Sequence, residues 1–597
     1  MKKIIYIAFG VCLFIVGCED PLDKQPLDLI SEKDVWSDEV LADSYIANLY
    51  DQARFFRGSN DDNIGMADVL NGGFARNYAT WPTGYAHATS SITPDIGSAA
   101  VFHYWIYSDI RAMNEAIEKL SNESSELSKG YRDTRLGEVY FIRAWSYFVM
   151  VRLYGGVPLV DRVQDIDEAE EDLWIPRSSE EEVYDFVASD LDKAYNLLVG
   201  KNLNEYGRIT EWAVLALKSR AMLYAASVGK FGMVQTIGSG DLQTTLGISD
   251  PDKYWKLSRD ASKEIIDHGP FELYDNNADP AKNFVEIFDN EGHSEIILAE
   301  VFTGQGDRWN RWDQWMWPTQ GRNGYSNFLK SFSHVLEKFE DKSGNFKLMN
   351  GSEFTLGDPS NRHSLDDFFY GDRDPRAQAS FYLPEAMWNG DPIYVHQGTY
   401  DMDDTYKTGG GTLTHPVTGK TVPMKGLNRD INGSALNVRK KVRESHDLTV
   451  APEGDSDYIV FRLAEIYLNY AEAELYVSSP NGDGLVYLNK VRQRVDMPDK
   501  PVLTQDIIRN ERNVELMFEG HHFWDTRRWR TAEAELNGKN FQGLQFRYHL
   551  ATDDYEIIKF NADNKARIFQ PHYYYYPIRS TDINANPYLV QNPGYIE

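Results

Sequence analysis

Cysteine is scarce in this sequence of 597 residues, which contains only Cys12 and Cys18. At most one disulfide can form, so no framework of disulfides supports the fold. Long apolar runs are scarce as well. The run at residues 4–16 has thirteen residues, whereas a helix needs about 20 to cross a bilayer core of about 30 Å. We therefore expect a globular chain that is stabilised by a large hydrophobic core.

Positive charge is the second shortage. The chain has 61 lysines and arginines against 91 acidic residues, and its formal net charge is −30 at pH 7. A charge of this sign repels phosphate backbones, so we do not expect nucleic acid as a partner.

Common catalytic motifs are also missing, because the sequence contains no GxSxG, HExxH, P-loop, dinucleotide-binding or protein-kinase motif. We therefore expect a protein that is not an enzyme and has no cofactor. A carboxylate pair for glycoside hydrolysis stays open, because 91 acidic residues offer many pairs whose separation the sequence does not reveal.

Two segments contain residue types that bind metals in other proteins. His521, His522 and Asp525 lie close together, but adjacent histidines point to different faces of a helix. Residues 275–286 resemble an EF-hand loop, yet Pro280 stands where that loop needs glycine. We expect no metal at either place and interpret residues 275–286 as a solvated acidic turn.

The N-terminus has the composition of an export signal. Lys2 and Lys3 precede the apolar run, which ends in Ile-Val-Gly-Cys at Cys18 and resembles the lipobox of bacterial lipoproteins. We expect residues 1–17 to be removed and Cys18 to carry lipid. The alternative is an ordinary signal peptide with an incidental cysteine. Lipid would anchor the protein to a membrane without spanning it.

Residues 139–154 form a second apolar segment. A transmembrane helix here would place Arg143 and Arg152 in hydrocarbon, at a cost of about 2.5–3.5 kcal/mol each near the centre. The segment is better explained as a buried helix of a large helical domain.

Helical periodicity predicts a mostly α fold. Small residues on several of these helices favour close stacking, so we expect tetratricopeptide-like helix pairs. Residues 58–100 and 302–455 are rich in glycine, asparagine and aromatics, and we expect long irregular loops with a few short strands there. Residues 566–597 are expected to be extended. The predicted helices cover residues 38–56, 102–120, 180–198, 210–228, 458–477 and 504–519.

Residues 307–317 read DRWNRWDQWMW and hold four of the chain's 14 tryptophans. Such a cluster must either fill a core or bind a flat ligand, because leaving one indole in water forgoes roughly 4–5 kcal/mol. Sugars suit this composition, since their apolar faces stack on indoles while polar side chains bind the hydroxyls. We expect one to three rings to touch a ligand and the rest to pack. The candidate ligand-binding residues of the two loop segments are Arg76, Asn77, Tyr78, Trp81, Arg308, Trp309, Arg311, Trp312, Asp313, Trp315, Trp317 and Gln320.

Several segments together resemble the SusD/RagB family of surface lipoproteins. They occur in family order and include GEVYFIRAWSYFVMVRLYGGVPLV (137–160), FRLAEIYLNYAEAE (461–474), IRNERNVELMFEGHHFWDTRRW (508–529) and YYYYPIRSTDINANPYLVQNPGY (573–595). His521-His522-Phe523 and Thr526 depart from the usual pattern, in a part that the family uses as scaffold. The resemblance favours buried ion pairs over catalysis for Arg143, Glu511, Arg512, Glu515 and Arg528.

The resemblance implies a SusD-like fold and a non-catalytic function. The protein would be a lipoprotein on the outer face of the outer membrane, anchored at Cys18, and would act as the lid of a SusC-like TonB-dependent transporter that imports oligosaccharides. A peptide-binding lid is the alternative, and a surface glycosidase is less favoured. One domain is expected over residues 18–597. It would comprise a helical scaffold (about 36–300 and 456–530), a ligand-binding insert (about 302–455) and the extended C-terminal segment 566–597.

Overall fold

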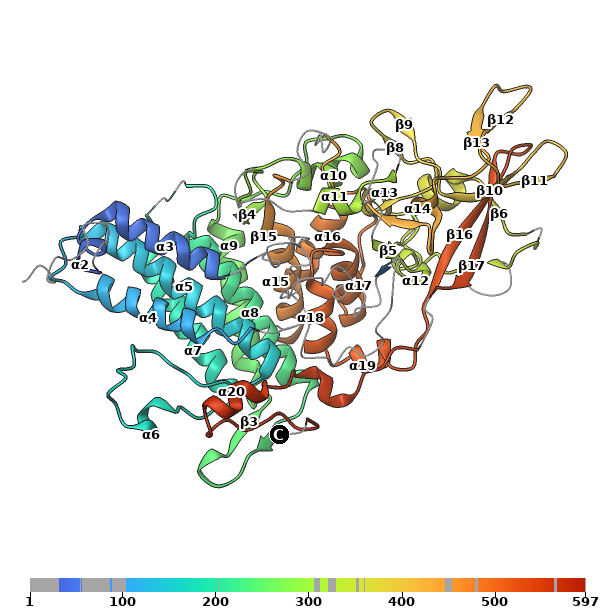
Figure 1. Ribbon diagram of the computed structural model, residues 1–597. Helices are drawn as coiled ribbons and strands as arrows, with labels where there is room; N and C mark the ends of the chain where they lie inside the picture. The colour runs from blue at the N-terminus through green and yellow to red at the C-terminus, as the bar shows by residue number, and fades with distance from the viewer. Residues whose placement is uncertain are drawn as a thin grey trace, which may run out of the picture.

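A computed structural model describes residues 32–53, 55, 86–88, 104–201, 203, 205–304, 312–319, 329–349, 354–358, 360–445, 454–477, 482–562 and 566–595. Long helices form one side of the molecule, and short strands with loops form the other (Figure 1). The C-terminal segment returns to the helical side (Figure 1).

Helices dominate the structure, which confirms the expected mostly α fold. The longer helices are α3 (Glu39–Ala53), α4 (Tyr107–Ser121), α5 (Lys129–Tyr154), α7 (Glu180–Leu198), α8 (Glu211–Phe231), α9 (Pro251–His268), α10 (Pro280–Asp289), α15 (Leu463–Val477), α16 (Gly484–Gln493), α17 (Gln505–Glu515) and α18 (His521–Arg528). The shorter ones are α2 (Glu32–Val35), α6 (Glu170–Leu173), α11 (Trp312–Met316), α12 (Ser333–Leu336), α13 (Arg376–Ser380), α14 (Asn428–Ile431), α19 (Ala532–Leu536) and α20 (Ser580–Ala585).

Helices that follow one another in the chain pack together as stacked pairs. Helix α4 packs on α5, α5 on α7, α7 on α8, and α8 on α9. Helix α15 then packs on α9, which joins the C-terminal helices to the N-terminal stack. This arrangement agrees with the tetratricopeptide-like scaffold that the small-residue helix faces predicted.

Local sequence sets the starts of several helices. Thr210 and Thr504 cap α8 and α17, because each side chain accepts a hydrogen bond from a backbone N–H of the first turn. Ser179 forms a capping box with Glu182 at the start of α7. The predicted helix at residues 458–477 begins late, at Leu463, because Tyr458–Arg462 form a strand that pairs with Ile296–Glu300.

Helix α5 contains the apolar segment 139–154 and lies inside the protein. Every residue from Val139 to Tyr154 except Tyr140 is buried. The guanidinium of Arg143 donates to the Asp190 carboxylate of α7 at 2.7 and 2.9 Å, so its charge is paired within the protein. In the described part of the chain, no helix is both long enough and apolar enough for a membrane span. The interpretation of residues 139–154 as a buried helix is confirmed.

Small polar residues let α8, α9 and α15 approach closely. The hydroxyl oxygens of Ser219 and Ser262 lie 2.8 Å apart, and the Ser258 hydroxyl donates to the Ser219 carbonyl at 2.8 Å. The Asn469 amide of α15 donates to the Ser219 hydroxyl at 3.0 Å. A bulkier residue at position 219 would force the three helices apart.

The expected irregular segment at residues 302–455 contains more strands than its composition suggested. One sheet has the order β1-β5-β14-β7 and a second has the order β11-β10-β16-β17-β6. Their strands are β1 (Ala86–Ala88), β5 (Leu329–Ser331), β14 (Leu436–Val438), β7 (Phe381–Tyr382), β11 (Tyr406–Lys407), β10 (His396–Tyr400), β16 (Gln542–His549), β17 (Asp554–Asn561) and β6 (Arg362–His363). Two-stranded pairs complete the strands: β2 (Gln235–Ile237) with β3 (Thr244–Leu246), β4 (Ile296–Glu300) with β15 (Tyr458–Arg462), β8 (Met387–Trp388) with β9 (Asp391–Pro392), and β12 (Thr412–Thr414) with β13 (Thr421–Pro423).

The C-terminal segment is mostly extended, as expected, but includes a 3₁₀ turn (Pro571–Tyr574) and the short α20. It is bonded to the end of α5. Arg177 donates to the carbonyl of Tyr154 at 2.8 Å and to the Asn592 amide oxygen at 2.9 Å. Two segments that lie more than 400 positions apart in the sequence therefore share one guanidinium.

A buried ion-pair network fills the centre of the C-terminal helices. The fully buried Glu515 accepts from Arg462 at 2.6 Å, from Arg376 at 3.0 Å and from Arg494. Elsewhere, Arg512 and Arg528 both donate to Asp525. The ion pairs expected for Glu511 and Arg143 are also present, with Arg376 and Asp190. The structural role predicted for these residues is confirmed.

Candidate ligand-binding site

Residues 312–317 are the described part of the tryptophan-rich segment, and most of them form helix α11. Trp312 is only 4% exposed, and its indole N–H donates to the Lys440 carbonyl at 3.0 Å. The ammonium nitrogen of Lys441 lies 4.0 Å from the centroid of the Trp312 ring. At this distance a cation is attracted by the negative face of an indole. Trp312 therefore fastens the segment to the chain just beyond β14.

Asp313 and Trp317 strengthen the same attachment. The buried Asp313 carboxylate accepts from the backbone N–H of Arg443 at 2.9 Å and from the Ser456 hydroxyl at 3.3 Å. The Trp317 ring packs edge-on against Trp388, with 4.9 Å between centroids. For these three candidate residues, burial favours packing, which is one of the two roles that the sequence left open.

The other candidate residues are not placed by the structure. For Trp315 only the backbone in α11 is described. The signal peptide and Cys18 lie outside the described residues, as do Arg76, Asn77, Tyr78, Trp81, Arg308, Trp309, Arg311 and Gln320. Their contact with a ligand stays a prediction.

Strand pairing brings the two loop segments of the sequence together. Ala86 of β1 pairs with Ser331 of β5, and Ala88 pairs with Leu329, in an antiparallel register. Strand β1 belongs to the first loop segment and β5 to the second, so both segments share one sheet. Sequence periodicity could not reveal this relation, because each strand has only three residues.

Aromatic residues of the helical scaffold hold the start of the first loop segment. The indole N–H of Trp145 and the hydroxyl of Tyr104 both donate to the Ala53 carbonyl, each at 3.1 Å. Phe55 packs against Trp145 with 5.0 Å between ring centroids. These contacts fix the chain at the end of α3.

Acidic residues from inside and outside the second loop segment lie close to Arg443. Arg443 pairs with Asp455 at 3.0 Å and also with Glu291. Burial, with Glu444 and Asp313 nearby, raises the pKa of Asp289 to about 7. Burial also raises the pKa of Asp457 to about 6, although its carboxylate accepts from the Phe302 N–H at 2.9 Å. These carboxyl groups change charge within two units of neutral pH.

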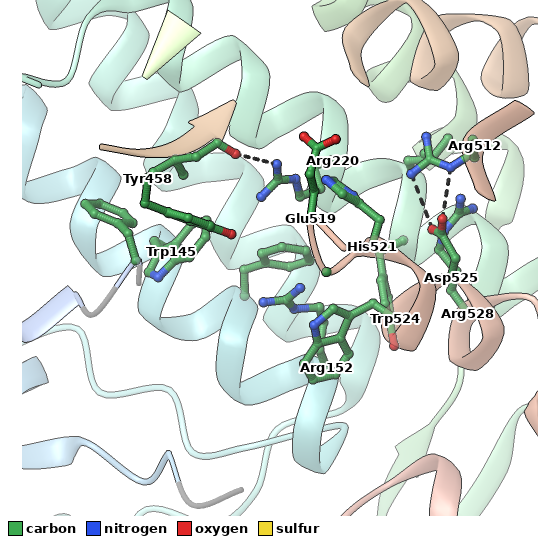
Figure 2. A pocket seen from close by; sticks show the side chains of 16 residues that line it. Trp145, Arg152, Arg220, Tyr458, Arg512, Glu519, His521, Trp524, Asp525 and Arg528 are labelled. Carbon is green, nitrogen blue, oxygen red and sulfur yellow. Dashed lines mark hydrogen bonds and ion pairs between the residues drawn. The ribbon is translucent and has the colours of Figure 1, made fainter. Parts of the chain in front are cut away.

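A small internal cavity lies between α5, α8, β15 and α18 (Figure 2). Arg152 lies over the Trp524 ring at 4.3 Å, and Arg220 donates to the Val460 carbonyl at 2.7 Å (Figure 2). The cavity volume is about 50 Å³, which suits a few water molecules but not a sugar, because small-molecule sites measure about 300–1,000 Å³. We assign this cavity to the scaffold.

His521 and its neighbours do not form a metal site. Burial and the charges of Arg220 and Arg512 hold the pKa of His521 well below its usual range. His522 is bonded to the Asn513 amide oxygen at 2.8 Å, and Asp525 is engaged by two guanidinium groups. Over the residues that the structure describes, no cluster of three ligating side chains is arranged to hold a metal.

Residues 275–286 start a helix rather than enclose an ion. The Asp279 carboxylate accepts from the backbone N–H groups of Ala281 and Lys282 at 3.0 and 3.3 Å, and Pro280 is the first residue of α10. The Asn277 amide donates to Glu286 at 2.7 Å. The residues that resemble EF-hand ligands therefore cap the start of α10 and form hydrogen bonds with it.

Sequence reasoning missed the residues that anchor the tryptophan-rich segment. Lys441, Arg443 and Trp388 lie between 71 and 131 positions from Trp312 and Trp317, and no local pattern links them. Lys441 also has a backbone φ of 65°, which non-glycine residues rarely adopt. Only the folded chain identifies these contacts.

Two family models match this chain, and together they cover most of its length. Residues 294–595 match the family model described as the SusD family, and residues 21–223 match a model described as "Starch-binding associating with outer membrane". A SusD-like protein of Bacteroides ovatus is 23% identical over 611 aligned positions, which cover 99% of this chain and 96% of that protein.

Solved structures share the fold. A SusD-like carbohydrate-binding protein of Bacteroides fragilis superposes with a TM-score of 0.66 at 20% identity, over 93% of this chain and 99% of that one. A structure solved with a xylogluco-oligosaccharide has a TM-score of 0.57 at 19% identity, over 92% of this chain and 97% of that one. The folds are alike over nearly their whole length.

Proposed function

The chain belongs to the SusD family, and on this premise we propose that it is a cell-surface glycan-binding lipoprotein. In this proposal the protein captures oligosaccharides and acts as the lid of a TonB-dependent outer-membrane transporter that imports them. Binding and handing over cargo need no chemistry in the protein, so we propose no catalytic residues.

Family membership is the observation that carries the glycan assignment. Among the proteins with this fold, one is a carbohydrate-binding protein and another was solved with a xylogluco-oligosaccharide. The sequence supports the same ligand class, because both loop segments combine aromatic rings with polar side chains. The β1–β5 pairing supports a single site, since it holds parts of both segments in one sheet.

We propose different roles for the candidate residues. Trp312, Asp313 and Trp317 anchor the second segment, because all three are buried. The ligand contacts proposed from the remainder are Arg76, Asn77, Tyr78, Trp81, Arg308, Trp309, Arg311, Trp315 and Gln320.

We also propose that lipid at Cys18 holds the protein on the outer face of the outer membrane. The lipobox-like sequence before Cys18 and the acidic Glu19 and Asp20 after it support this location. The outer-membrane description of the family model for residues 21–223 agrees with it. Cross-linking in intact cells should join the protein to a TonB-dependent transporter, and its absence from cross-linked outer-membrane complexes would contradict the lid role.

Calorimetry and affinity electrophoresis against a panel of glycans test the proposed ligand. We expect at least one oligosaccharide to bind. Replacing a stacking residue, Trp81→Ala or Trp309→Ala, should weaken binding by about 1–3 kcal/mol, by analogy with base stacking, and leave the melting temperature nearly unchanged.

The anchoring variant Trp312→Ala is the matched control, because it should lower the melting temperature instead. If no glycan binds and peptides do, a peptide-binding lid replaces the glycan proposal. Release of shorter products from a bound polysaccharide by the purified protein would support a glycosidase.

A further inference from the structure

A lysine-lined pocket lies between α12, α19 and the start of β16. These three elements lie where the helical side of the molecule meets the strands (Figure 1). The volume of the pocket is about 410 Å³, within the range of small-molecule sites. We call it the lysine pocket and define it by Lys338, Lys539, Lys559, His334, His522 and Glu535. The pocket contains none of the residues proposed as glycan contacts, although His334 and Lys338 lie within the second loop segment.

The charge of the lysine pocket is opposite to that of the whole protein. Three lysines line it against one glutamate, whereas the chain carries a net charge of −30. Arg567 lies close by, 4.9 Å from the ring centroid of Phe541. One further acid, Glu337, is engaged by Lys559 at 3.4 Å. A surplus of positive charge in so acidic a protein attracts small anions to this place.

Two of the lysines form no ion pair with the acidic residues that the structure describes. Within the residues that the structure describes, no carboxylate pairs with the ammonium group of Lys338 or Lys539, whereas Lys559 donates to the Met349 carbonyl at 2.8 Å. Lys338 is partly buried, and burial lowers its pKa despite the nearby Glu337 and Glu535. An ammonium group in this setting gains more from an anion than a lysine in open solvent does.

His334 adds an uncharged donor. Its ring stacks on Phe541 with 4.5 Å between centroids, and burial together with the charges of Lys338, Arg567 and Lys559 lowers its pKa to about 3. The imidazole is therefore neutral near pH 7 and carries one N–H. In the same pocket, Nε2 of His522 lies 3.5 Å from a carboxylate oxygen of Glu535.

We propose that the lysine pocket binds an oxyanion, with Lys338 and Lys539 as its charged contacts and the His334 N–H as a neutral donor. Carboxylate, sulfate and phosphate share the required chemistry. The identity of the natural occupant rests on the proposed glycan function: it is the acidic group of a charged saccharide, either a uronate carboxylate or a sulfate ester. The protein would then distinguish acidic cargo from neutral cargo through residues other than the proposed aromatic contacts.

Calorimetry at low ionic strength tests the pocket with four probes: inorganic sulfate, inorganic phosphate, glucuronate and glucose. We expect binding of glucuronate and of at least one inorganic anion, no binding of glucose, and weakening by salt. Lys338→Met should weaken binding about tenfold or more, the loss expected when a charge-assisted hydrogen bond is removed. Lys338→Met should not lower the melting temperature, because it removes a partly buried charge that forms no ion pair with any described residue.

Lys256→Met is the matched control, since Lys256 is exposed on α9 and the substitution removes the same charge. The control should bind anions like the unmodified protein, and the exposed Lys539→Ala provides a second pocket variant. Absence of anion binding, or equal weakening by Lys256→Met and Lys338→Met, would overturn the proposal. Stronger binding of glucuronate than of the inorganic anions supports a charged saccharide as the occupant. Equal binding would overturn the saccharide as occupant and support a site for free anions.

Binding of a neutral oligosaccharide separates this proposal from the proposed function. Trp309→Ala should weaken that binding and leave anion binding intact, and Lys338→Met should do the reverse. If neutral glycans bind and no anion does, only the lysine-pocket proposal fails. If anions bind and no glycan does, the proposed function fails and the oxyanion site stands.

Discussion

The ammonium nitrogen of Lys441 lies 4.0 Å from the centroid of the Trp312 ring, while the Trp312 N–H donates to the carbonyl of the preceding residue, Lys440. The Trp312 indole thus makes a hydrogen bond through its N–H and a cation–π contact through its ring face. The backbone φ of Lys441 is 65° in this arrangement. The contact holds a five-residue helix that would be marginal on its own.

Replacing Trp312 should destabilise the protein. Trp312→Ala removes a buried indole, and we expect a loss of about 3–5 kcal/mol in the free energy of unfolding. Thermal and urea denaturation measure this change. Trp312→Phe should lose less, because it keeps a ring beneath Lys441. Unchanged stability together with lost glycan binding would contradict the anchoring role.

Neutralising Asp289 should stabilise the protein at alkaline pH. The pKa of this carboxyl group is raised to about 7, so the folded state holds its proton more tightly than the unfolded state does. The resulting stabilisation is full below about pH 4 and is lost as the pH rises to 7. Asp289→Asn should therefore exceed the unmodified protein in stability at pH 8 by on the order of 1 kcal/mol.

The difference in stability between Asp289→Asn and the unmodified protein should vanish near pH 4. Denaturation midpoints at both pH values test this, with Asp241→Asn as an exposed control that should show no such pH dependence. A constant difference at all pH values would contradict the titration of Asp289.

Removing the Glu515 carboxylate from its ion-pair network should strongly destabilise the protein. Glu515→Gln leaves the buried guanidinium groups of Arg376, Arg462 and Arg494 with one carboxylate fewer, and we expect a loss of about 3–5 kcal/mol at pH 7. These arginines hold the pKa of Glu515 well below its usual range. Its contribution is therefore present above about pH 4.5 and is lost as the pH falls toward the folded pKa.

Urea denaturation of Glu515→Gln at pH 7 and pH 3 should show a smaller deficit at the lower pH. Glu533→Gln, on an exposed side chain, is the control and should change little. A Glu515→Gln variant as stable as the unmodified protein at pH 7 would show that the network adds nothing to stability.

Position 156 should accept only glycine. A Cβ at Gly156 would lie 1.9 Å from the Ser178 carbonyl oxygen, so Gly156→Ala must displace backbone and should cost about 1–3 kcal/mol or more. Gly130→Ala is the matched control in α5, because a Cβ there meets nothing within 4 Å. The control should stabilise by up to about 1 kcal/mol, because alanine favours the helix. Equal melting temperatures of the two variants would contradict this account.

Local sequence was sufficient for most of the scaffold. Helix α7 has the predicted bounds, and the Thr210 cap marks the start of α8, because capping and apolar periodicity act within a few residues. Arg143 and Arg152 correctly indicated a buried helix, since such charges are too costly in lipid without partners. The same reasoning failed at residues 458–462, where pairing with β4 overrode a helical pattern.

The residue pattern alone indicates the kind of protein: a mostly α scaffold with buried ion pairs, long aromatic segments and the motifs of one family. Folding then sets which of these residues come into contact. The burial of Trp312 and Trp317, the β1–β5 pairing and the gathering of lysines around His334 all join residues tens to hundreds of positions apart. Periodicity and caps act over a few residues, whereas packing and charge pairing depend on distances that only the folded chain sets.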